Sequence, residues 1–384
     1  MRILVLCYEY PPIGGGGGRV AKSVAEELVK RGHEVRVHTA ALGVLGEDEM
    51  IGGVRVIRTA SLRQLPDTCR VHEMGLYLVS ALIPVLQECT RWAPDVIHAH
   101  FAMPTGVLAW AVHQITRVPY VLTAHLGDVP GGVPEQTDRL FRIAGGLARK
   151  VWKGAAGATA VSDFVRELAE RAYRRPVLRI LNGVDLTTRP ARPTALADGK
   201  RHLVFVGRLN PQKNAPMLID ALARIPSLPW RLTLIGDGPD MPAVQQRIAG
   251  FWLDERVKLM GWQTSAEVAR VLDTADILCM PSLSEGMPVA AVEALRHGVA
   301  IACTDIPGLH DVLVPGVNGL AVASGNVAPF AGALRSMITD SSRLLAMRQA
   351  SWDKAQEFDL PAIAAEYEEE LRNAARPMRR RSVD

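Results

Sequence analysis

The sequence lacks the features that mark secreted, membrane-spanning or nucleic-acid-binding proteins. It has only five cysteines among 384 residues, and they are scattered without the paired spacing of a metal site. Cys7 and Cys279 lie in apolar runs, which predicts reduced core thiols of a cytosolic protein. The net charge of +4 is too weak to indicate a nucleic-acid partner.

Long apolar runs are also missing. The longest, Gly75 to Leu86, contains Pro84 and is too short to span a membrane, so we interpret it as a buried helix. The start of the chain, Met1 to Cys7, is too quickly broken for a signal peptide. These observations predict a cytoplasmic protein.

Charge is unevenly distributed along the chain. Residues 1–190 carry more Lys and Arg than Asp and Glu, and the last residues form a basic tail that includes Arg372, Arg376 and Arg379 to Arg381. Such an excess favours peripheral association with an anionic membrane, here at the inner face of the cell membrane.

The length and the pattern of elements predict two α/β domains. A chain of 384 residues is too long for one ordinary core, and short apolar strands alternate with helical segments throughout, which indicates parallel sheets covered by helices on both faces. Residues 186–200 are rich in Thr, Pro, Ala and Arg and have no periodicity, so we predict a linker there. The predicted domains are therefore 1–185 and 201–358, followed by a helix over 359–376 and the basic tail 377–384.

The first domain opens with a glycine-rich segment between a strand and a helix. The strand covers Ile3 to Cys7, five consecutive glycines end at Gly18, and a helix is predicted over Arg19 to Arg31. This order is typical of a Rossmann-type opening, and a glycine loop before a helix N-terminus can bind phosphate through backbone N–H groups. The alternative is a flexible surface loop, because a run of glycines matches any glycine motif.

The second half contains two carboxylates in a strand-to-helix connection. Glu285 follows the apolar run Ala275 to Met280, and Glu293 lies on a helix predicted to start near Pro288 and to stop at Gly298. Two carboxylates so placed can bind hydroxyls at both ends of an elongated ligand such as a nucleotide-sugar. The alternative is that both are solvated surface charges.

Further candidates follow other predicted strands, where ligands bind in parallel sheets. Arg208 and Lys213 can point at one diphosphate or be two solvated cations. His125 is either catalytic or structural, and for His100 the structural interpretation is preferred. His98 and His100 alternate on one strand without a supporting carboxylate, and there is no Asp-x-Asp motif, so we expect no metal.

These residues, in this order, resemble retaining glycosyltransferases of family 4, which have the GT-B fold of two Rossmann-like, doubly wound parallel-sheet domains facing a cleft. The similarity covers nearly the whole chain, and the pair Glu285 and Glu293 with its seven intervening residues is its most specific part. The other matching segments are Pro11 to Gly15, Arg31 to Val35, Asp95 to His100, Asn182 to Asp185, Gly207 to Lys213 and Gly236 to Pro239.

The resemblance implies a role for each of these positions. It assigns catalysis to His125, Arg208, Lys213 and Glu285. It assigns donor binding to Gly16, Gly17, Gly207, Gly236, Trp262, Gly286, Met287 and Glu293, and acceptor binding to Gly18, Arg19, His100 and Asp128. The last helix is expected to cross back onto the first domain.

The implied activity is metal-independent, retaining transfer of a sugar from a UDP- or GDP-sugar to a saccharide or lipid-linked acceptor, without a bound cofactor. A nucleotide-sugar epimerase of the same fold, a non-catalytic nucleotide-sugar-binding protein and, more distantly, a nicotinamide oxidoreductase are the alternatives. Two positions depart from the family pattern: Asn214 stands where glycine is common, and Met287-Pro288 stands where Phe-Gly is common. The donor sugar is therefore left open.

Overall fold

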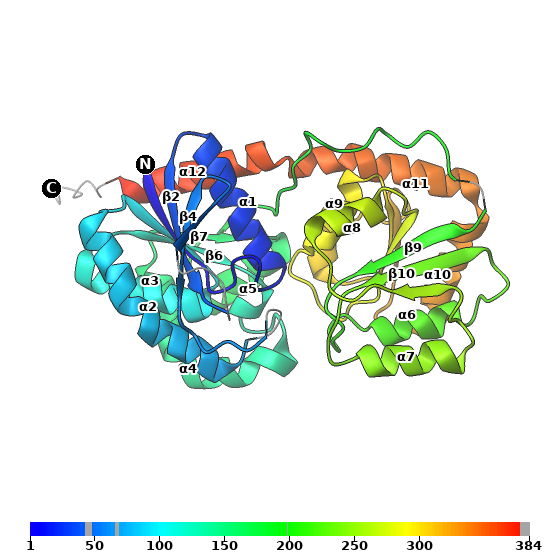
Figure 1. Cartoon of the computed structure of the whole chain (residues 1–384), viewed down its shortest axis with the longest axis horizontal. Helices are drawn as coiled ribbons and strands as arrows, with labels where there is room; N and C mark the ends of the chain where they lie inside the picture. The colour runs from blue at the N-terminus through cyan, green and yellow to red at the C-terminus, as the bar shows by residue number, and fades with distance from the viewer. Residues whose placement is uncertain (43–47, 66–68, 198, 377–384) are drawn as a thin grey trace. The chain divides into compact units, whose positions relative to one another are not determined.

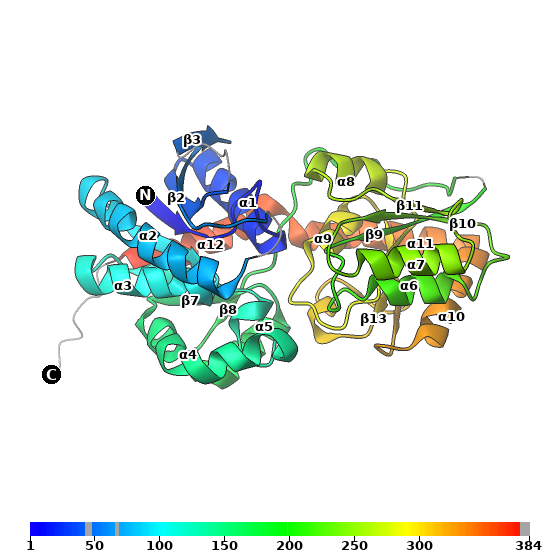
Figure 2. The ribbon, with the colours of Figure 1, turned by 60° about the horizontal axis from the view of Figure 1, so that its bottom comes forward.

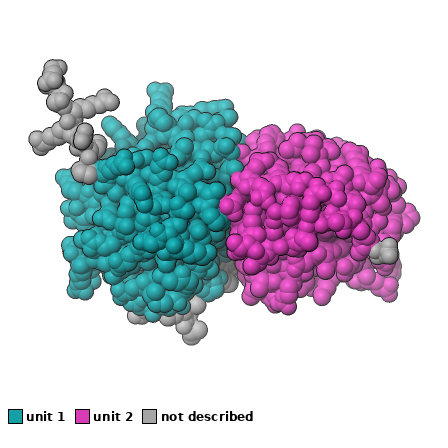
Figure 3. Space-filling view, turned by 90° about the horizontal axis from the view of Figure 1, so that it is seen from above, with its two compact units in different colours: residues 1–183, 360–384 teal, residues 184–359 magenta. Residues whose placement is uncertain are grey.

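The computed structural model describes residues 1–42, 48–65, 69–197 and 199–376, apart from the side chains at 134–140, 142 and 143. The chain divides into two compact units, which Figure 3 distinguishes by colour. Unit 1 comprises residues 1–183 and 360–384, and unit 2 comprises residues 184–359. The predicted basic tail, 377–384, lies outside the described residues.

Unit 1 is built on one sheet with the strand order β3-β4-β2-β1-β5-β6-β7-β8. Its strands are β1 (Arg2–Leu6), β2 (Glu34–Ala40), β3 (Asp48–Ile51), β4 (Val54–Thr59), β5 (Val96–His100), β6 (Tyr120–Ala124), β7 (Gly157–Ala160) and β8 (Leu178–Arg179). Its helices are α1 (Gly16–Lys30), α2 (Val71–Arg91), α3 (Val107–Thr116), α4 (Pro134–Gly154), α5 (Asp163–Tyr173) and α12 (Leu360–Ala375). The sequence pattern did not predict β3 or α4.

One edge of this sheet departs from the predicted parallel arrangement. The strand β3 pairs antiparallel with β4, whereas the other strand pairs of the sheet are parallel. Ile51 pairs with Val54, so only Gly52 and Gly53 form the turn, with φ of +57° and +81°. Such a two-residue hairpin turn needs positive φ at both positions, which glycine adopts without a steric penalty.

The strand order fixes which helices share a face of the sheet. Right-handed crossovers place α1, between β1 and β2, on one face, and place α2, α3, α4 and α5, which lead to strands on the other side of β1, on the opposite face. Figures 1 and 2 show α2, α3 and α4 side by side, and α12 packs against α1.

The prediction that the apolar run within α2 forms a buried helix is only half right. Tyr77, Ala81 and Val85 face the sheet and are buried. On the opposite side, Leu76, Val79 and Ile83 are 36%, 74% and 64% exposed. From Met74 to Gln87 this helix has no charged residue on any side, and a helix that is apolar all round is ordinarily buried. The apolar run therefore predicted more burial than the structure shows. No described helix is long and apolar enough to cross a membrane.

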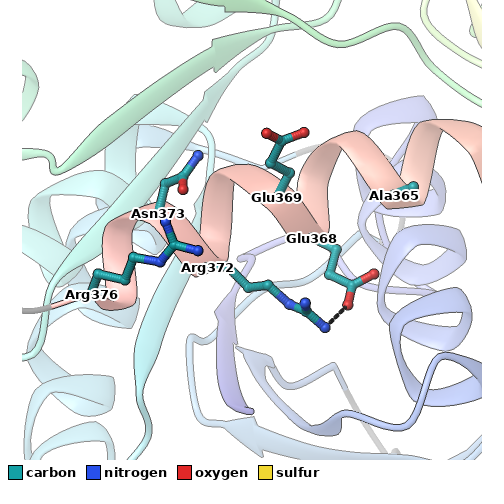
Figure 4. A pocket seen from close by; sticks show the side chains of 6 residues that line it. All are labelled: Ala365, Glu368, Glu369, Arg372, Asn373 and Arg376. Carbon is teal, nitrogen blue, oxygen red and sulfur yellow. Dashed lines mark hydrogen bonds and ion pairs between the residues drawn. The ribbon is translucent and has the colours of Figure 1, made fainter.

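The final helix, α12, belongs to unit 1 and is fixed by a buried carboxylate. Ile363, Tyr367 and Leu371 are buried, and α12 contacts β5, β6 and β7. The Glu368 carboxylate accepts hydrogen bonds from Arg31 Nε at 2.6 Å and from Arg372 at 2.5 Å, and lies 2.9 Å from His33 Nε2. Figure 4 shows a pocket of about 320 Å³ on this helix, which none of the predicted site residues lines. Its walls come from Ala365, Glu368, Glu369, Arg372, Asn373 and Arg376.

Unit 2 contains a six-stranded, wholly parallel sheet with the order β11-β10-β9-β12-β13-β14. Its strands are β9 (Arg201–Val206), β10 (Trp230–Ile235), β11 (Val257–Leu259), β12 (Ile277–Met280), β13 (Ala300–Thr304) and β14 (Gly319–Val322). Its helices are α6 (Ala215–Leu222), α7 (Met241–Gly250), α8 (Ser265–Leu272), α9 (Val289–Arg296), α10 (Val327–Thr339) and α11 (Ser341–Lys354). The sequence pattern did not predict α7. The buried core of unit 2 includes Trp230, Phe205 and Phe330.

The segment predicted to be a linker is attached to α11 within unit 2. The guanidinium of Arg189 lies 3.4 Å from the ring centroid of Trp352. Arg192 pairs with Asp353 at 2.8 Å, and the Gln349 amide donates to the carbonyl of Pro193 at 3.0 Å. These contacts make the segment a strap along a helix rather than a free spacer.

Replacing Glu368 by alanine should destabilise unit 1. The substitution leaves the buried His33 and the partly exposed Arg31 without their acceptor, and a buried group left unsatisfied costs about 1–3 kcal/mol. Chemical denaturation of the full chain measures this loss. Glu369→Ala, at an exposed position of the same helix, is the matched control and should change stability by less than about 0.5 kcal/mol. Equal effects of the two substitutions would contradict the anchoring role.

Candidate functional site

Each sheet has one point where the chain reverses its direction of strand addition. In unit 1 this point lies between β1 and β5, and in unit 2 it lies between β9 and β12. At such a point the loops after the two central strands leave the sheet in opposite directions, so a crevice forms at their carboxyl ends. The predicted site residues of both units lie on these loops or beside them.

In unit 2 the two central loops are joined by an ion pair. Lys213 follows β9 and Glu285 follows β12, and the Lys213 Nζ lies 2.6 Å from Glu285 Oε1. The same carboxylate oxygen accepts a hydrogen bond from Ser282 Oγ at 2.7 Å. Glu285 is buried, and Lys213 is half-buried beside it. The pair therefore fixes the position of the ammonium group as well as the carboxylate.

Backbone contacts hold the same two loops together. Leu283 N donates to the carbonyl of Gln212 at 2.7 Å, and the Gln212 amide donates to the carbonyl of Ser284 at 2.9 Å. The Glu285 carbonyl lies so close to Gly308 that a Cβ there would stand 1.8 Å from it. A side chain at position 308 would therefore displace the loop that carries Glu285.

Gly207 and Gly236 bring two neighbouring loops into close contact. A Cβ on Gly236, which has a φ of +138°, would lie 1.8 Å from the Gly207 carbonyl. The backbone N–H of Gly236 donates to Gly261 at 2.8 Å, which places the loop of the exposed Trp262 beside it. The stem of Lys213 passes within 3.5 Å of a Cβ built on Gly207. These positions are therefore neighbours of the Lys213 and Glu285 pair.

The remaining predicted residues of unit 2 lie on the same loops. Arg208 is half-buried next to Gly207 and pairs with no carboxylate among the described side chains. Gly286 and Met287 are buried beside Glu285, and Glu293 is half-buried at the fifth position of α9. Asn214 has a φ of +51°, so it adopts the left-handed conformation that glycine would favour there.

The start of α9 differs from the prediction by one position. Pro288 is the residue before the first helical residue, with φ of −73° and ψ of 119°, rather than a residue of the first turn. The extended ψ directs the chain from the Glu285 loop into the helix. The predicted stop is confirmed, because Gly298 has a φ of +59° just beyond the C-terminal residue of α9.

In unit 1 the glycine run is largely helical, not a loop. The helix α1 begins at Gly16, three residues before the predicted start. Gly14 has a φ of +88°, and a Cβ on Gly18 would lie 1.8 Å from the carbonyl of Glu9. The Glu9 carboxylate accepts the N–H of Gly15 at 3.2 Å. The glycines thus let the first turn of α1 pack directly on the loop after β1, and Gly16 and Arg19 lie on this same turn.

Gly17 is packed against an aromatic cluster that includes His125. A Cβ on Gly17 would lie 2.5 Å from Phe101 Cζ and 3.3 Å from His125 Cε1. The ring centroids of Phe101 lie 4.5 Å from His125 and 5.0 Å from Tyr8. Phe101 has a φ of +72°, which is strained for a bulky residue. Residues from three strand ends therefore meet at this point.

His125 stands at the end of a row of buried imidazoles. Its Nε2 lies 3.5 Å from His100 Nδ1, and the His100 ring lies 4.2 Å from that of His98. Burial lowers the pKa of His125 to about 4 and that of His98 to about 3, and lowers the pKa of His100 well below its usual value. All three are therefore neutral at pH 7. His100 is fully buried behind His125.

Asp128 supports the backbone of His125. Its carboxyl oxygen accepts the N–H of His125 at 2.8 Å, and the side chain is buried. Burial raises the pKa of Asp128 to about 8, although backbone N–H groups of His125, Met103 and Ala102 act in the opposite direction. The carboxyl group therefore places no full negative charge beside His125 at neutral pH.

Sequence reasoning missed several residues that complete these two clusters. Phe101 and Tyr8 directly follow strands β5 and β1, and Ser282 and Gln212 lie on the loops that carry Glu285 and Lys213. The signal was available, because all four lie just beyond the carboxyl end of a central strand. Among the described residues, no three His, Cys, Asp or Glu side chains are grouped to hold a metal ion.

A methyl group at position 17 should disturb the cluster around His125. Gly17→Ala would push Phe101 and His125 apart, and we expect transfer activity to fall about tenfold or more, as misplacement of a positioned group does. Gly145→Ala, in α4 with no atom near the added Cβ, is the control and should be neutral or stabilising. Rates and melting temperatures of both variants test this, and a fully active Gly17→Ala enzyme would contradict it.

The chain matches two family models that together cover most of its length. Residues 14–188 match "Glycosyltransferase Family 4", and residues 200–340 match "Glycosyl transferases group 1". The glycogen synthase of Mycobacterium tuberculosis is 27% identical over 95% of this chain and 92% of that protein. A putative teichuronic acid biosynthesis glycosyltransferase of Bacillus subtilis is 29% identical over 81% of this chain and 83% of that protein.

Solved structures give the same result for the fold. Sucrose-phosphate synthase from Thermosynechococcus elongatus superposes with a TM-score of 0.84 at 19% identity, covering 97% of this chain and 98% of that one. Anabaena HepE, solved in complex with UDP and glucose, has a TM-score of 0.78 at 22% identity, covering 97% and 99%. Both confirm the predicted GT-B fold. The chain has two α/β units and matches both family models, and it belongs to glycosyltransferase family 4.

Proposed function

We propose that this glycosyltransferase is a metal-independent, retaining enzyme that moves a sugar from a UDP- or GDP-sugar to a hydroxyl of a saccharide or lipid-linked acceptor. The observation that carries this proposal is the Lys213 and Glu285 ion pair of 2.6 Å at the switch point of unit 2. It places a fixed cation and a fixed carboxylate where nucleotides bind in doubly wound sheets.

The proposed role of unit 2 is to bind the donor and to stabilise the departing diphosphate. Lys213 and Arg208 supply positive charge on one strand-to-helix loop, and such preorganised groups stabilise charge that develops in the transition state. Glu285 binds hydroxyls of the donor sugar, and Glu293 binds the ribose hydroxyls. This division needs no metal ion, because side chains and backbone N–H groups balance the diphosphate charge.

The proposed role of unit 1 is to contribute His125 and the first turn of α1. The lowered pKa of His125 makes it a neutral group that donates or accepts a hydrogen bond near the reacting carbon. Gly16 and Gly17 would contact the donor phosphate, and Gly18 and Arg19 would contact the acceptor. We propose that the leaving phosphate helps to deprotonate the acceptor hydroxyl, so that the reaction needs no protein nucleophile.

The relatives support a nucleotide-sugar donor but differ in their acceptors. HepE has been solved with UDP-glucose, while one relative from Nocardia farcinica is a D-inositol 3-phosphate glycosyltransferase with 27% identity over 90% of this chain. The glycogen synthase relative favours a saccharide acceptor, and we propose a lipid-linked saccharide as the other acceptor class. We also propose that the protein works at the inner face of the cell membrane.

A donor panel tests the proposed reaction. The protein is incubated with UDP-, GDP- and ADP-sugars, with and without EDTA, and with saccharide acceptors or water. We expect hydrolysis or transfer of a UDP- or GDP-sugar that EDTA does not reduce, with the anomeric configuration retained in the product. Strict dependence on a metal would contradict the proposal, whereas isomerised donor without transfer would indicate an epimerase and binding without turnover a non-catalytic protein.

Two substitutions separate binding from turnover. Lys213→Ala removes the charge that stabilises the leaving group, so we expect kcat to fall about a hundredfold or more. Glu293→Ala removes a charge-assisted contact to the ribose, so we expect the donor Kd to rise about tenfold or more. Lys258→Ala, at an exposed position of β11, is the control. Full activity of both variants would show that the site is misplaced.

A further inference from the structure

The outward side of α2 departs from an ordinary solvated surface. Leu76, Val79 and Ile83 are exposed at spacings of three and four residues, so they form one apolar stripe along the helix. Ile115, near the end of the neighbouring helix α3, is 63% exposed. Exposed apolar side chains grouped along a helix in this way are typical of a site for a protein partner or a membrane.

A second helix in the same layer shows what an ordinary solvated face looks like here. On α5, Arg166 pairs with Asp163 at 2.8 Å, and Arg171 pairs with Glu167 at 3.0 Å. The helix α2 has no such pairs in its middle, because no charged residue occurs from Met74 to Gln87. The apolar stripe is therefore a local feature of α2 and α3.

The exposed charged residues at the ends of α2 and α3 are arginines. Arg70 and Arg91 stand at the two ends of α2, and Arg117 ends α3; all three are exposed and none pairs with a described carboxylate. The acidic residues of α2 are not available at the surface, because Glu73 is buried and Glu88 pairs with Arg36 at 2.7 Å. The helix α3 has no acidic residue at all.

We propose that this surface, formed by Leu76, Val79, Ile83, Ile115, Arg70, Arg91 and Arg117 and called here the α2–α3 surface, docks on an anionic lipid bilayer. Apolar side chains enter the boundary of headgroups and acyl chains while flanking cations contact anionic headgroups. A second copy of the chain fits less well, because an isologous contact would bring the same cations face to face.

This docking deepens the proposed function by giving the enzyme a way to reach a lipid-linked acceptor, but it does not depend on the donor chemistry. The surface lies on α2 and α3, whereas the clusters at His125 and Lys213 lie on loops at the carboxyl ends of strands. Substitutions on the α2–α3 surface therefore leave the residues assigned to catalysis or binding unchanged.

Flotation of the full chain with lipid vesicles tests the proposal. Vesicles of phosphatidylcholine alone are compared with vesicles in which about a third of the lipid is phosphatidylglycerol, and we expect at least about tenfold stronger partitioning to the anionic vesicles. Val79→Glu together with Ile83→Glu should lower that partitioning about tenfold or more. Arg91→Gln together with Arg117→Gln should lower it roughly fivefold per residue.

The matched control is Val314→Glu together with Val317→Glu, two exposed apolar positions of unit 2. It changes the net charge by the same amount as the Val79→Glu, Ile83→Glu variant. We expect partitioning within about twofold of the unchanged protein, because salt screens an added charge from groups that are not near it. All variants should keep their melting temperature and its shift with UDP, which shows that they fold and that a failure of docking is separate from a failure of the donor site.

Three results would overturn the proposal. One is equal partitioning of the Val79→Glu, Ile83→Glu variant and the unchanged protein. Another is equal binding to neutral and anionic vesicles. The third is a dimer in solution that this variant loses while no vesicle binding occurs, which would assign the surface to a second copy of the chain.

Discussion

The reversal of strand order at the centre of each sheet is the constraint on which the rest of the structure depends. Parallel strands end at one edge, and where the chain changes direction the two central loops leave an opening between them. In unit 2 the Lys213 and Glu285 pair spans those loops, and in unit 1 the first turn of α1 packs on Phe101 and His125. The same topological feature thus positions a charged cluster in one unit and a neutral, aromatic cluster in the other.

The sequence was sufficient to predict this fold because both periodicity and order were clear. Apolar strands alternating with helices predict a doubly wound sheet, and the helix stop at Gly298 followed from glycine chemistry alone. What could not be predicted depended on contacts between distant residues. The early start of α1 is one example: three glycines look like a loop in sequence, and the close approach of the Glu9 carbonyl, which requires glycine at position 18, becomes visible only in the structure.

The same contrast applies to the site residues: their positions follow from the sequence pattern, whereas their contacts with distant residues do not. The motif pattern singled out Lys213, Glu285 and His125 as candidates, but it did not predict the interactions around them. Spacing in the sequence does not indicate that Lys213 Nζ meets Glu285, 72 positions further on, or that Phe101 would adopt a strained φ to pack between Tyr8 and His125. For α2 the pattern was misleading, because an apolar run predicts burial while its outward half faces solvent.

The electrostatic contrast between the clusters bears on how the proposed reaction divides its work. Burial keeps His125, His100 and His98 neutral and favours the protonated form of Asp128 at neutral pH, so these four groups bring little charge to the cluster of unit 1. The charged groups beside them are Glu9 and Arg63, which pair with each other at 3.5 Å. Unit 2 brings Lys213, Arg208 and Glu285. A reaction whose main electrostatic demand is the negative charge of a leaving diphosphate needs its cations beside that group. We therefore infer that unit 2 supplies the cations that balance the diphosphate in the proposed reaction. Unit 1 supplies the uncharged side chains of His125 and Phe101 and the first turn of α1.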